Sequence, residues 1–421
     1  MQQSNFSHKF SDDLGVIQLM DDLGTYVGKP GYIMLGGGNP AQIPEVEAYF
    51  QQATAHLLED EERFKAIIGT YSAPGGENEF RVELAAYLSK TYGWPITADN
   101  ISLTNGSQTT FFYLFNMFAG DFPDGSHKQI LLPLAPEYIG YKDAGLTPNM
   151  FRSYRPEITL LEDDLFKYSV DFNALTVDEN IGAICVSRPT NPTGNVLDSA
   201  EMAQLSHLAK EHQIPLIVDN AYGLPFPNII FSDETPDWEP HMILCLSLSK
   251  LGLPGLRTGI IIANEDITRK IASMNAVISL APGSLGPALA LNALKTGEIG
   301  RLSNQLIRPY YEEKVWKMIG FLRAALDGIN FYIHKPEGAI FVWLWFPKLP
   351  ITSQRLYELL RDEGVLVIPG EHFFPGLPED SNDPWMHRYE CIRVSYAADI
   401  ELVEKGAKII GEVVKRVLNS A

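Results

Sequence analysis

The segment Ser-Leu-Ser-Lys-Leu-Gly-Leu-Pro-Gly-Leu-Arg, residues 247–257, places a lysine directly after an apolar strand and inside a loop of hydroxyls and glycines. Lys250 is the fourth residue of this segment and Arg257 is the last. A partly desolvated lysine near an arginine has a lowered pKa, so its amine becomes a usable nucleophile, most directly for Schiff-base formation. The alternative, a lysine that only caps a strand, stays open on this segment alone.

Short β-rich runs alternate with helical patterns from about residue 97 to residue 265, which predicts an α/β sheet with crossover helices. The predicted strands are residues 130–133, 182–187, 215–219, 243–247 and 258–263. Several of these runs are apolar throughout, as is typical of central strands covered on both faces. Ligands of such sheets bind beyond the carboxyl ends of the strands, so the polar residues that follow each run are the candidate site.

The chain has 421 residues, more than one hydrophobic core usually accommodates. The pattern of predicted helices and strands changes near residue 300. Helical patterns are then followed by strands at residues 339–345, 365–368 and 391–395 and by a final helix that reaches about residue 417. We therefore expect an N-terminal arm packing with the small domain, a large domain and a smaller α+β domain. Their boundaries are residues 1–48, 49–297 and 298–421.

The net charge of −19, from 33 basic and 52 acidic residues, argues against a broad surface for nucleic acid or anionic membranes. No apolar run reaches the roughly 18 residues of a membrane span, and the first residues lack the pattern of a signal peptide. The three cysteines, Cys185, Cys245 and Cys391, are widely spaced and predict neither disulfides nor a metal site. These features favour a cytoplasmic protein.

Two further segments predict anion binding. Gly106, Ser107 and Gln108 precede an apolar helical run, and the free N–H groups of a helix N-terminus attract anions. The alternative is a simple turn with Ser107 as the helix cap. Arg393 lies inside an apolar strand, where the paired N–H donors of its guanidinium suit a carboxylate. A salt-bridged structural arginine is the alternative.

Asp219 ends the apolar run at residues 215–218, and a buried carboxylate there needs a cationic partner. A protonated pyridine nitrogen is such a partner, and an aspartate that caps the next helix is the alternative. Both interpretations are compatible with the residues around it.

The Lys250 segment resembles the lysine loop of fold-type I pyridoxal-phosphate-dependent aminotransferases, whose usual form is S-x-S-K followed by G-x-P-G-x-R. One departure is that Arg257 lies seven residues after Lys250, where many members have eight. The resemblance implies an α/β fold whose large domain has a mostly parallel seven-stranded sheet flanked by helices. It also implies pyridoxal 5′-phosphate as cofactor, held as a Schiff base by Lys250.

The same resemblance implies roles for other residues. Backbone N–H groups of Ser107 and Gln108 would hold the phosphate together with Ser247, Ser249 and Arg257. Asp219 would meet the ring nitrogen, and Tyr222 and Asn191 the phenolic oxygen. Tyr138 would stack on the ring, and Tyr71 would reach the phosphate of the neighbouring subunit in a homodimer. Either tyrosine could instead be an ordinary aromatic.

For the substrate, the resemblance implies that Arg393 and Asn191 grip the α-carboxylate and that the glycine-rich run at residues 35–40, with Gly38, closes over it. Residues 33–44, 112–119, 133–141 and 342–345 are similar to members that act on valine and pyruvate. No second arginine is placed by motif to meet a side-chain carboxylate. We expect a ping-pong transfer between small aliphatic L-amino acids, such as valine and alanine, and 2-oxo acids, such as pyruvate and 3-methyl-2-oxobutanoate.

Two other functions compete with this prediction. A C–S β-lyase on the same scaffold would begin with the same deprotonation at Cα. A non-catalytic regulator that senses the cofactor would need a DNA-binding module, and the acidic chain shows no basic helix-turn-helix segment.

Overall fold

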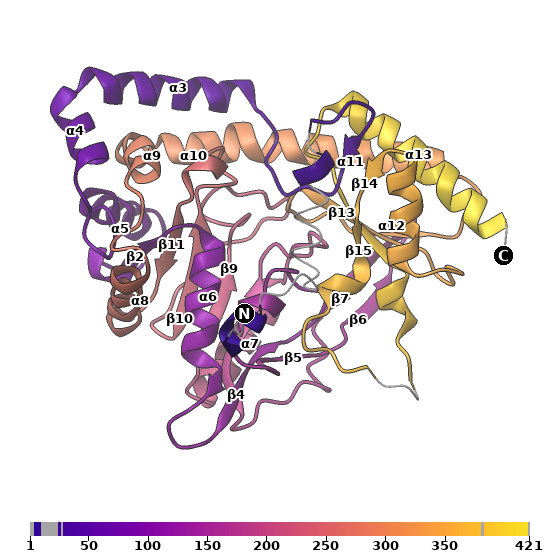
Figure 1. Ribbon diagram of the computed structural model, residues 1–421, viewed down its shortest axis with the longest axis horizontal. Coiled ribbons are helices and arrows are strands. Elements are labelled where there is room, and N and C mark those ends of the chain that lie inside the picture. Colours follow the sequence, from indigo (N-terminus) through magenta and orange to yellow (C-terminus); the bar gives the residue numbers. More distant parts are fainter. Residues whose placement is uncertain (1–3, 10–23, 27, 380–382, 420–421) are drawn as a thin grey trace.

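The structure, a computed structural model, describes residues 4–9, 24–26, 28–379 and 383–419. Within these residues the strands form an eight-stranded sheet, a six-stranded sheet and a two-stranded pair. Figure 1 shows the two larger sheets side by side, with the long helices α3 (Pro44–Glu59) and α11 (Arg308–Ala325) across the top of the view. Among the described residues, no helix is both long and apolar enough to cross a bilayer.

The eight-stranded sheet has the order β2-β11-β10-β9-β8-β4-β3, and β5 also pairs with β4. Strands β10, β9, β8, β4 and β5 are parallel to their neighbours in this series, whereas β11 is antiparallel to β10 and β2. The sheet has one strand more than expected, because the two-residue β3 pairs with β4. The strands are β2 (Ile101–Thr104), β3 (Gly120–Asp121), β4 (His127–Leu132), β5 (Phe151–Ser153), β8 (Ile181–Ser187), β9 (Leu216–Asp219), β10 (Met242–Ser247) and β11 (Gly259–Ile262).

Helices cover both faces of this sheet, which explains why its central strands are buried at every position. In β8, Ala183 and Cys185 pack in the core cluster of helix α6 (Ser107–Phe118), while Ile184 and Val186 pack in the cluster of helix α7 (Ser199–Glu211). Successive side chains of a strand point to opposite faces, so α6 and α7 lie on opposite sides. The remaining helices before residue 302 are α1 (Asn5–Lys9), α4 (Glu61–Gly69), α5 (Asn78–Tyr92), α8 (Glu265–Ile278), α9 (Leu285–Thr296) and α10 (Glu298–Arg301).

The six-stranded sheet has the order β15-β16-β13-β12-β7-β6 and carries α12 (Ser353–Asp362) and α13 (Ile400–Asn419). Its strands are β6 (Glu157–Leu160), β7 (Leu165–Ser169), β12 (Tyr332–His334), β13 (Phe341–Trp345), β15 (Ile368–Pro369) and β16 (Cys391–Ser395). Strands β6 and β7 come from the range expected to belong to the large domain. The second sheet is therefore built from two distant parts of the chain.

The strand predicted at residues 365–368 is two strands with different partners. β14 (Val365–Leu366) pairs with β1 (Ile33–Met34), whereas β15 pairs with β16. The N-terminal arm thus joins the C-terminal part of the protein, and Ser395 N also donates a hydrogen bond to Leu35 O at 2.6 Å. Residues 10–23 of the predicted arm lie outside the described residues.

Candidate active site

A cavity of about 440 Å³ opens at the carboxyl ends of β8, β9 and β10. It contains every candidate residue from the sequence except Tyr71. The candidate residues that line it are Gly38, Ser107, Gln108, Tyr138, Asn191, Asp219, Tyr222, Ser247, Ser249, Lys250, Arg257 and Arg393. Residues from distant parts of the sequence therefore converge where a sheet of this kind binds ligands.

The Lys250 amine lies inside this cavity and donates a hydrogen bond to Gly38 O on the N-terminal arm. It also lies 5.2 Å from the centre of the Tyr222 ring. Burial, together with the positive charges of Arg393 and Arg257, lowers the pKa of Lys250 to about 8. A substantial fraction of this amine is thus unprotonated near neutral pH, as a nucleophile or a base requires.

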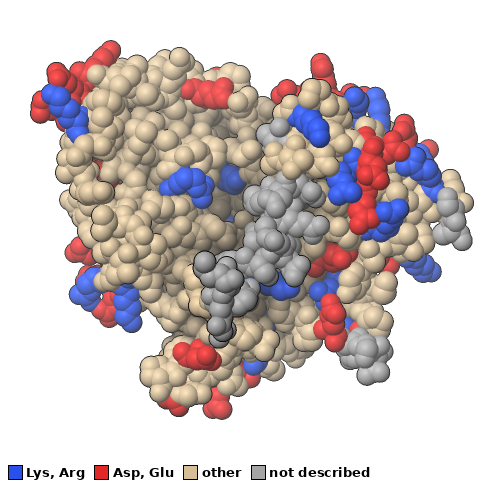
Figure 2. All heavy atoms as spheres, in the orientation of Figure 1, with Lys and Arg blue, Asp and Glu red and all other residues tan. Residues whose placement is uncertain are grey.

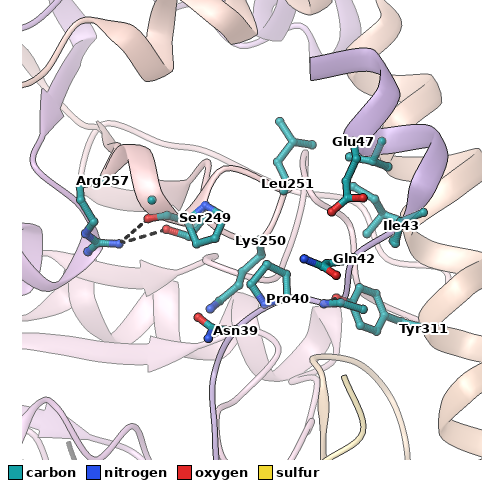
Figure 3. A pocket seen from close by; sticks show the side chains of 16 residues that line it. Asn39, Pro40, Gln42, Ile43, Glu47, Ser249, Lys250, Leu251, Arg257 and Tyr311 are labelled. Carbon is teal, nitrogen blue, oxygen red and sulfur yellow. Dashed lines mark hydrogen bonds between the residues drawn. The ribbon is translucent and has the colours of Figure 1, made fainter. Parts of the chain in front are cut away.

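The Lys250 amine also faces a second cavity of about 620 Å³ (Figure 3). The arm forms one wall through residues such as Asn39 and Gln42, and the lysine loop forms the opposite wall. Tyr311 of α11 anchors the arm here, since its hydroxyl accepts a hydrogen bond from Ala41 N at 2.7 Å. Both cavities share Lys250, so the arm and the loop together define the approach to the amine.

Positive charge gathers at the N-terminus of α6. Gly106 occupies the N-cap position with φ of 95°, and no side chain caps the helix, so the alternative with Ser107 as cap is wrong. The Arg257 guanidinium lies against Gly106, because a Cβ at that position would be 2.2 Å from Arg257 Nη2. Arg257 also donates a hydrogen bond to Ser249 Oγ at 3.4 Å. A helix N-terminus and an arginine that meet at one point form an anion site.

Asp219 lies at the floor of the cavity. Its Oδ1 accepts a hydrogen bond from Ala221 N at 2.9 Å and its Oδ2 accepts one from the Tyr141 hydroxyl at 2.8 Å. Burial raises the pKa of Asp219 to about 6, although both hydrogen bonds and the nearby Lys250 act in the opposite direction. The next helical segment after Asp219 is the short 3-10 helix Pro254–Leu256, so Asp219 is not a helix cap.

Asn191 and Tyr138 both line the cavity. Asn191 Oδ1 accepts a hydrogen bond from Arg393 Nη1 at 2.6 Å. The ring of Tyr138 lies over Gly140, where a Cβ would be 2.5 Å from Tyr138 Cε1. Glycine at position 140 therefore lets the tyrosine ring lie close to the backbone.

Arg393 is buried in β16, and its guanidinium lies between the rings of Phe341 and Phe373 at 4.0 and 5.2 Å. Its Nη2 donates to Gly36 O at 2.7 Å, and its Nε is buried without a hydrogen-bond partner. No carboxylate of the described residues forms an ion pair with Arg393. A buried arginine without a counter-ion suits an anionic ligand, and the structural salt bridge considered from the sequence is wrong.

Tyr71 is the candidate that the structure does not bring to this cavity. Its side chain is 78% exposed, in the loop between α4 and α5. Its expected role lies in a second subunit, so the single chain leaves that prediction untested.

Sequence reasoning missed three residues around Asp219 and the cavity, namely Glu137, Tyr141 and Ser187. Glu137 is 1% exposed, and its carboxyl bonds the N–H and the hydroxyl of Ser187. The signal that was available is the spacing in Pro-Glu-Tyr-Ile-Gly-Tyr, residues 136–141, which directly follows a buried strand.

The residues present fit pyridoxal phosphate. The α6 N-terminus with Arg257 supplies donors for a phosphate, and the Ser107 hydroxyl there is buried without a partner. Asp219 supplies an acceptor for a ring nitrogen, and the Lys250 amine in the same cavity interacts electrostatically with Asp219, Arg257 and Arg393. In the described residues, no group of three or more His, Cys, Asp or Glu side chains is placed to hold a metal ion.

Comparison with known proteins gives consistent matches along the chain. Residues 52–410 match the family model "Aminotransferase class I and II". The chain is 51% identical over 416 residues to the valine–pyruvate aminotransferase of Escherichia coli K12, with 99% of each chain covered.

Two solved structures are similar to this one over nearly their full length. The crystal structure of a putative amino-acid aminotransferase from Psychrobacter arcticum 273-4 has a TM-score of 0.97 at 45% identity, with all of both chains covered. The crystal structure of the valine-pyruvate aminotransferase from Salmonella typhimurium LT2 has a TM-score of 0.88 at 48% identity, covering 97% of this chain and 100% of that one.

Proposed function

This chain belongs to the class I and II aminotransferases, and from that premise we propose that it transfers an amino group between a small aliphatic L-amino acid and a 2-oxo acid. Valine and alanine are the proposed donors, and pyruvate and 3-methyl-2-oxobutanoate the proposed acceptors. The observation that carries an amino-acid substrate is Arg393, a buried arginine with an unpartnered Nε that lines the same cavity as Lys250.

The cofactor of this enzyme is pyridoxal phosphate, which supplies an aldehyde that receives the amino group and a ring that accepts electrons from the substrate Cα. We propose that Ser107, Gln108, Arg257 and the serines of the lysine loop hold the phosphate. The Asp219 carboxylate would hold the ring nitrogen and keep it protonated. Asn191 and Tyr222 line the same cavity.

We propose that Lys250 transfers the proton at the substrate Cα. Its Nζ has a pKa lowered to about 8, so it can accept a proton near neutral pH and return it. Arg393, through two guanidinium nitrogens, would fix the substrate carboxylate and thereby aim the Cα–H at Lys250. The rings of Phe341 and Phe373 exclude water from that pairing, which strengthens it.

The lining of the cavity supports a small apolar substrate side chain. Its cationic residues are Lys250, Arg257 and Arg393, each already assigned, so none is left to meet a second carboxylate. Phe111 and Ile139 are among the apolar residues in the same wall. A substrate side chain with a negative charge would have to be buried there without a partner, which is costly.

We also propose a homodimer whose subunits complete each other's sites. Tyr71, Val277, Ile278 and Leu280 are exposed apolar side chains, each at least 59% accessible. The Tyr71 loop touches the loop that follows α8, because the Ser72 hydroxyl donates a hydrogen bond to Pro282 O at 3.2 Å. An apolar surface of this kind marks an interaction site.

This surface adjoins the phosphate site, because Asn105, next to Gly106, hydrogen-bonds to Ser279 and Gly283 in the same loop. A partner subunit that covers it would bring its own Tyr71 loop near the cofactor. We further propose domain boundaries near residues 48 and 297. We also propose a cytoplasmic location and a role in branched-chain amino acid synthesis. The three cysteines are buried and free, as a reducing compartment permits.

A half-reaction tests the proposal. Valine, alanine or aspartate is added separately to the purified enzyme without any acceptor, and the loss of the cofactor's visible absorbance is followed. We expect valine and alanine to discharge the band and aspartate to be far slower. Preferential reaction with aspartate would exclude the substrate proposal but not the aminotransferase. Lys250→Ala, the control, should lose transfer by at least about 10³-fold, because acid–base catalysis commonly contributes that much.

A further inference from the structure

Glu137 is a buried carboxyl group next to the site, and the roles described above do not use it. It lies in the loop after β4, between the apolar strand and Tyr138. It does not line the cavity, but it hydrogen-bonds to Ser187 and Tyr138, which do. The Glu137 backbone N–H donates to Phe373 O at 2.8 Å, which fixes the loop to the ring that packs on Arg393.

The side chain of Glu137 is bonded only to neutral donors. Oε1 accepts from Ser187 N at 2.9 Å, and Oε2 contacts the Ser187 hydroxyl and accepts from Tyr138 N at 3.3 Å. No lysine or arginine among the described residues forms an ion pair with Glu137. A buried carboxylate without a cation is costly, so the neutral acid is the favoured form.

The connection to Asp219 runs through Ser187 and Tyr141. Ser187 and Asp219 are direct partners in the β8–β9 register, and Arg188 N donates to Asp219 O at 2.8 Å. Four residues after Glu137, the Tyr141 hydroxyl bonds to Asp219 Oδ2. The loop at residues 137–141 therefore contacts Asp219 through Tyr141 and Ser187 through Glu137.

We propose that Glu137 is a positioning residue that stays protonated in the working enzyme, so that Asp219 is the single carboxylate behind the ring nitrogen of the cofactor. An ionised Glu137 would act on Asp219, to which its loop is connected through Tyr141 and Ser187. Its charge would favour transfer of the shared proton from the ring nitrogen to Asp219 and would weaken the electron-accepting ring. This inference rests on the proposed function, because it concerns Asp219 in that role.

The groups that face Glu137 support this assignment. Asp219 and Cys185 approach from β9 and β8, and Tyr138 and Tyr141 are in its own loop. Burial, with the charge of Asp219, raises the pKa of Glu137 to about 8, while the hydrogen bonds from Ser187 lower it. Burial raises the pKa of Cys185 and of both tyrosines, so these remain neutral as well. Lys250, across the cavity, acts on Asp219.

Infrared spectra of the cofactor-free protein test the protonation state without any turnover. The carbonyl stretch of a protonated carboxylic acid is followed against pH in the wild type, Glu137→Gln and Glu390→Gln. Glu390 is a matched control, a buried glutamate of the six-stranded sheet region that bonds to Trp345 Nε1 and Lys348 N. We expect a signal that disappears near pH 8, is absent in Glu137→Gln and remains in the control.

The holoenzyme provides the second readout. In the wild type we expect kcat/KM for valine to decrease at alkaline pH. The midpoint of this decrease should lie at least one pH unit higher in Glu137→Gln and should be unchanged in Glu390→Gln. Ser187→Ala leaves Glu137 intact but removes the hydroxyl that stabilises its ionised form. In that variant the infrared midpoint should move to higher pH, which tests the idea even if Glu137→Gln fails to fold.

An ionised Glu137 at pH 7, or an alkaline limb unchanged in Glu137→Gln, would overturn the inference. Failure of the proposed function looks different. In that case the infrared signal behaves as expected and valine does not discharge the cofactor band.

Discussion

Replacing Gly106 with alanine should weaken cofactor binding through Arg257. A Cβ at position 106 would lie 2.2 Å from Arg257 Nη2, about 1 Å closer than non-bonded atoms settle. The guanidinium must therefore leave the helix N-terminus. The φ of 95° adds backbone strain of about 1–3 kcal/mol for any residue with a side chain.

The loss of cofactor affinity follows from the hydrogen bond between Arg257 and the phosphate that this change removes. A hydrogen bond to a charged group contributes about 1.5–3 kcal/mol, which corresponds to roughly 10- to 100-fold in the dissociation constant of pyridoxal phosphate. Equilibrium dialysis of the cofactor against the apoenzyme measures this constant, and the melting temperature of the apoenzyme measures the backbone strain separately.

Two further variants isolate the cause. Gly255→Ala is the matched control, because a Cβ there meets nothing within 4 Å in the same loop. In an Arg257→Gln background, Gly106→Ala should add little to the loss of affinity, since the two changes act on one contact. Full additivity, or wild-type cofactor affinity in Gly106→Ala, would show that Arg257 is not the phosphate ligand.

Three other outcomes are expected. Arg393→Lys should lower kcat/KM for valine by about 10- to 100-fold in steady-state assays, because lysine cannot form the paired hydrogen bonds of a guanidinium; an unchanged value would place the substrate carboxylate elsewhere. The pKa of Asp219 is raised to about 6 in the fold, so the apoenzyme loses stability as pH rises from about 4 to 6. Urea unfolding at pH 7 should therefore find apo Asp219→Asn more stable by up to about 3 kcal/mol, yet weaker in binding the cofactor. Burial lowers the pKa of His334 and of His387 to about 3, so each should lower the free energy of unfolding by about 2 kcal/mol at pH 5. In urea titrations, His387→Gln should therefore reduce the loss of stability at acidic pH.

The sequence predicted the parts of the site that depend on local order along the chain. Lys250 and Arg257 lie in one loop, and Asp219 and Arg393 stand at or within buried strands, so their neighbours alone indicate their chemistry. The strands that carry them were predicted within one or two residues, because a polar residue at the end of an apolar run is a strong boundary.

The sequence did not predict the contacts that depend on register. Tyr141 bonds to Asp219 across 78 positions of the chain, and only the order of β4, β8 and β9 brings them together. The strands β6 and β7 also escaped prediction. They are short, and the exposed side chains of β6 give little apolar signal. The strand β12, which joins β7 to the rest of the sheet, lies more than 160 residues further along the chain.

The charge of the site is opposite to that of the whole protein. The chain carries a net charge of −19, and acidic and basic side chains are interspersed on the face shown in Figure 2, side by side over α12 and α13. The cavity nevertheless holds Lys250, Arg257 and Arg393 against one ionisable carboxyl group, Asp219, in its lining.

At physiological salt, surface charges more than about 8 Å away are largely screened, whereas buried charges are not. The local cations therefore decide which ligand stays bound, and the acidic surface affects mainly the approach of anions. It follows that salt should change the association rate of the cofactor and substrate more than the affinity of either. A neutral Glu137 fits this balance, because a second carboxylate beside Asp219 would cancel part of the positive charge that a phosphate and a substrate carboxylate require.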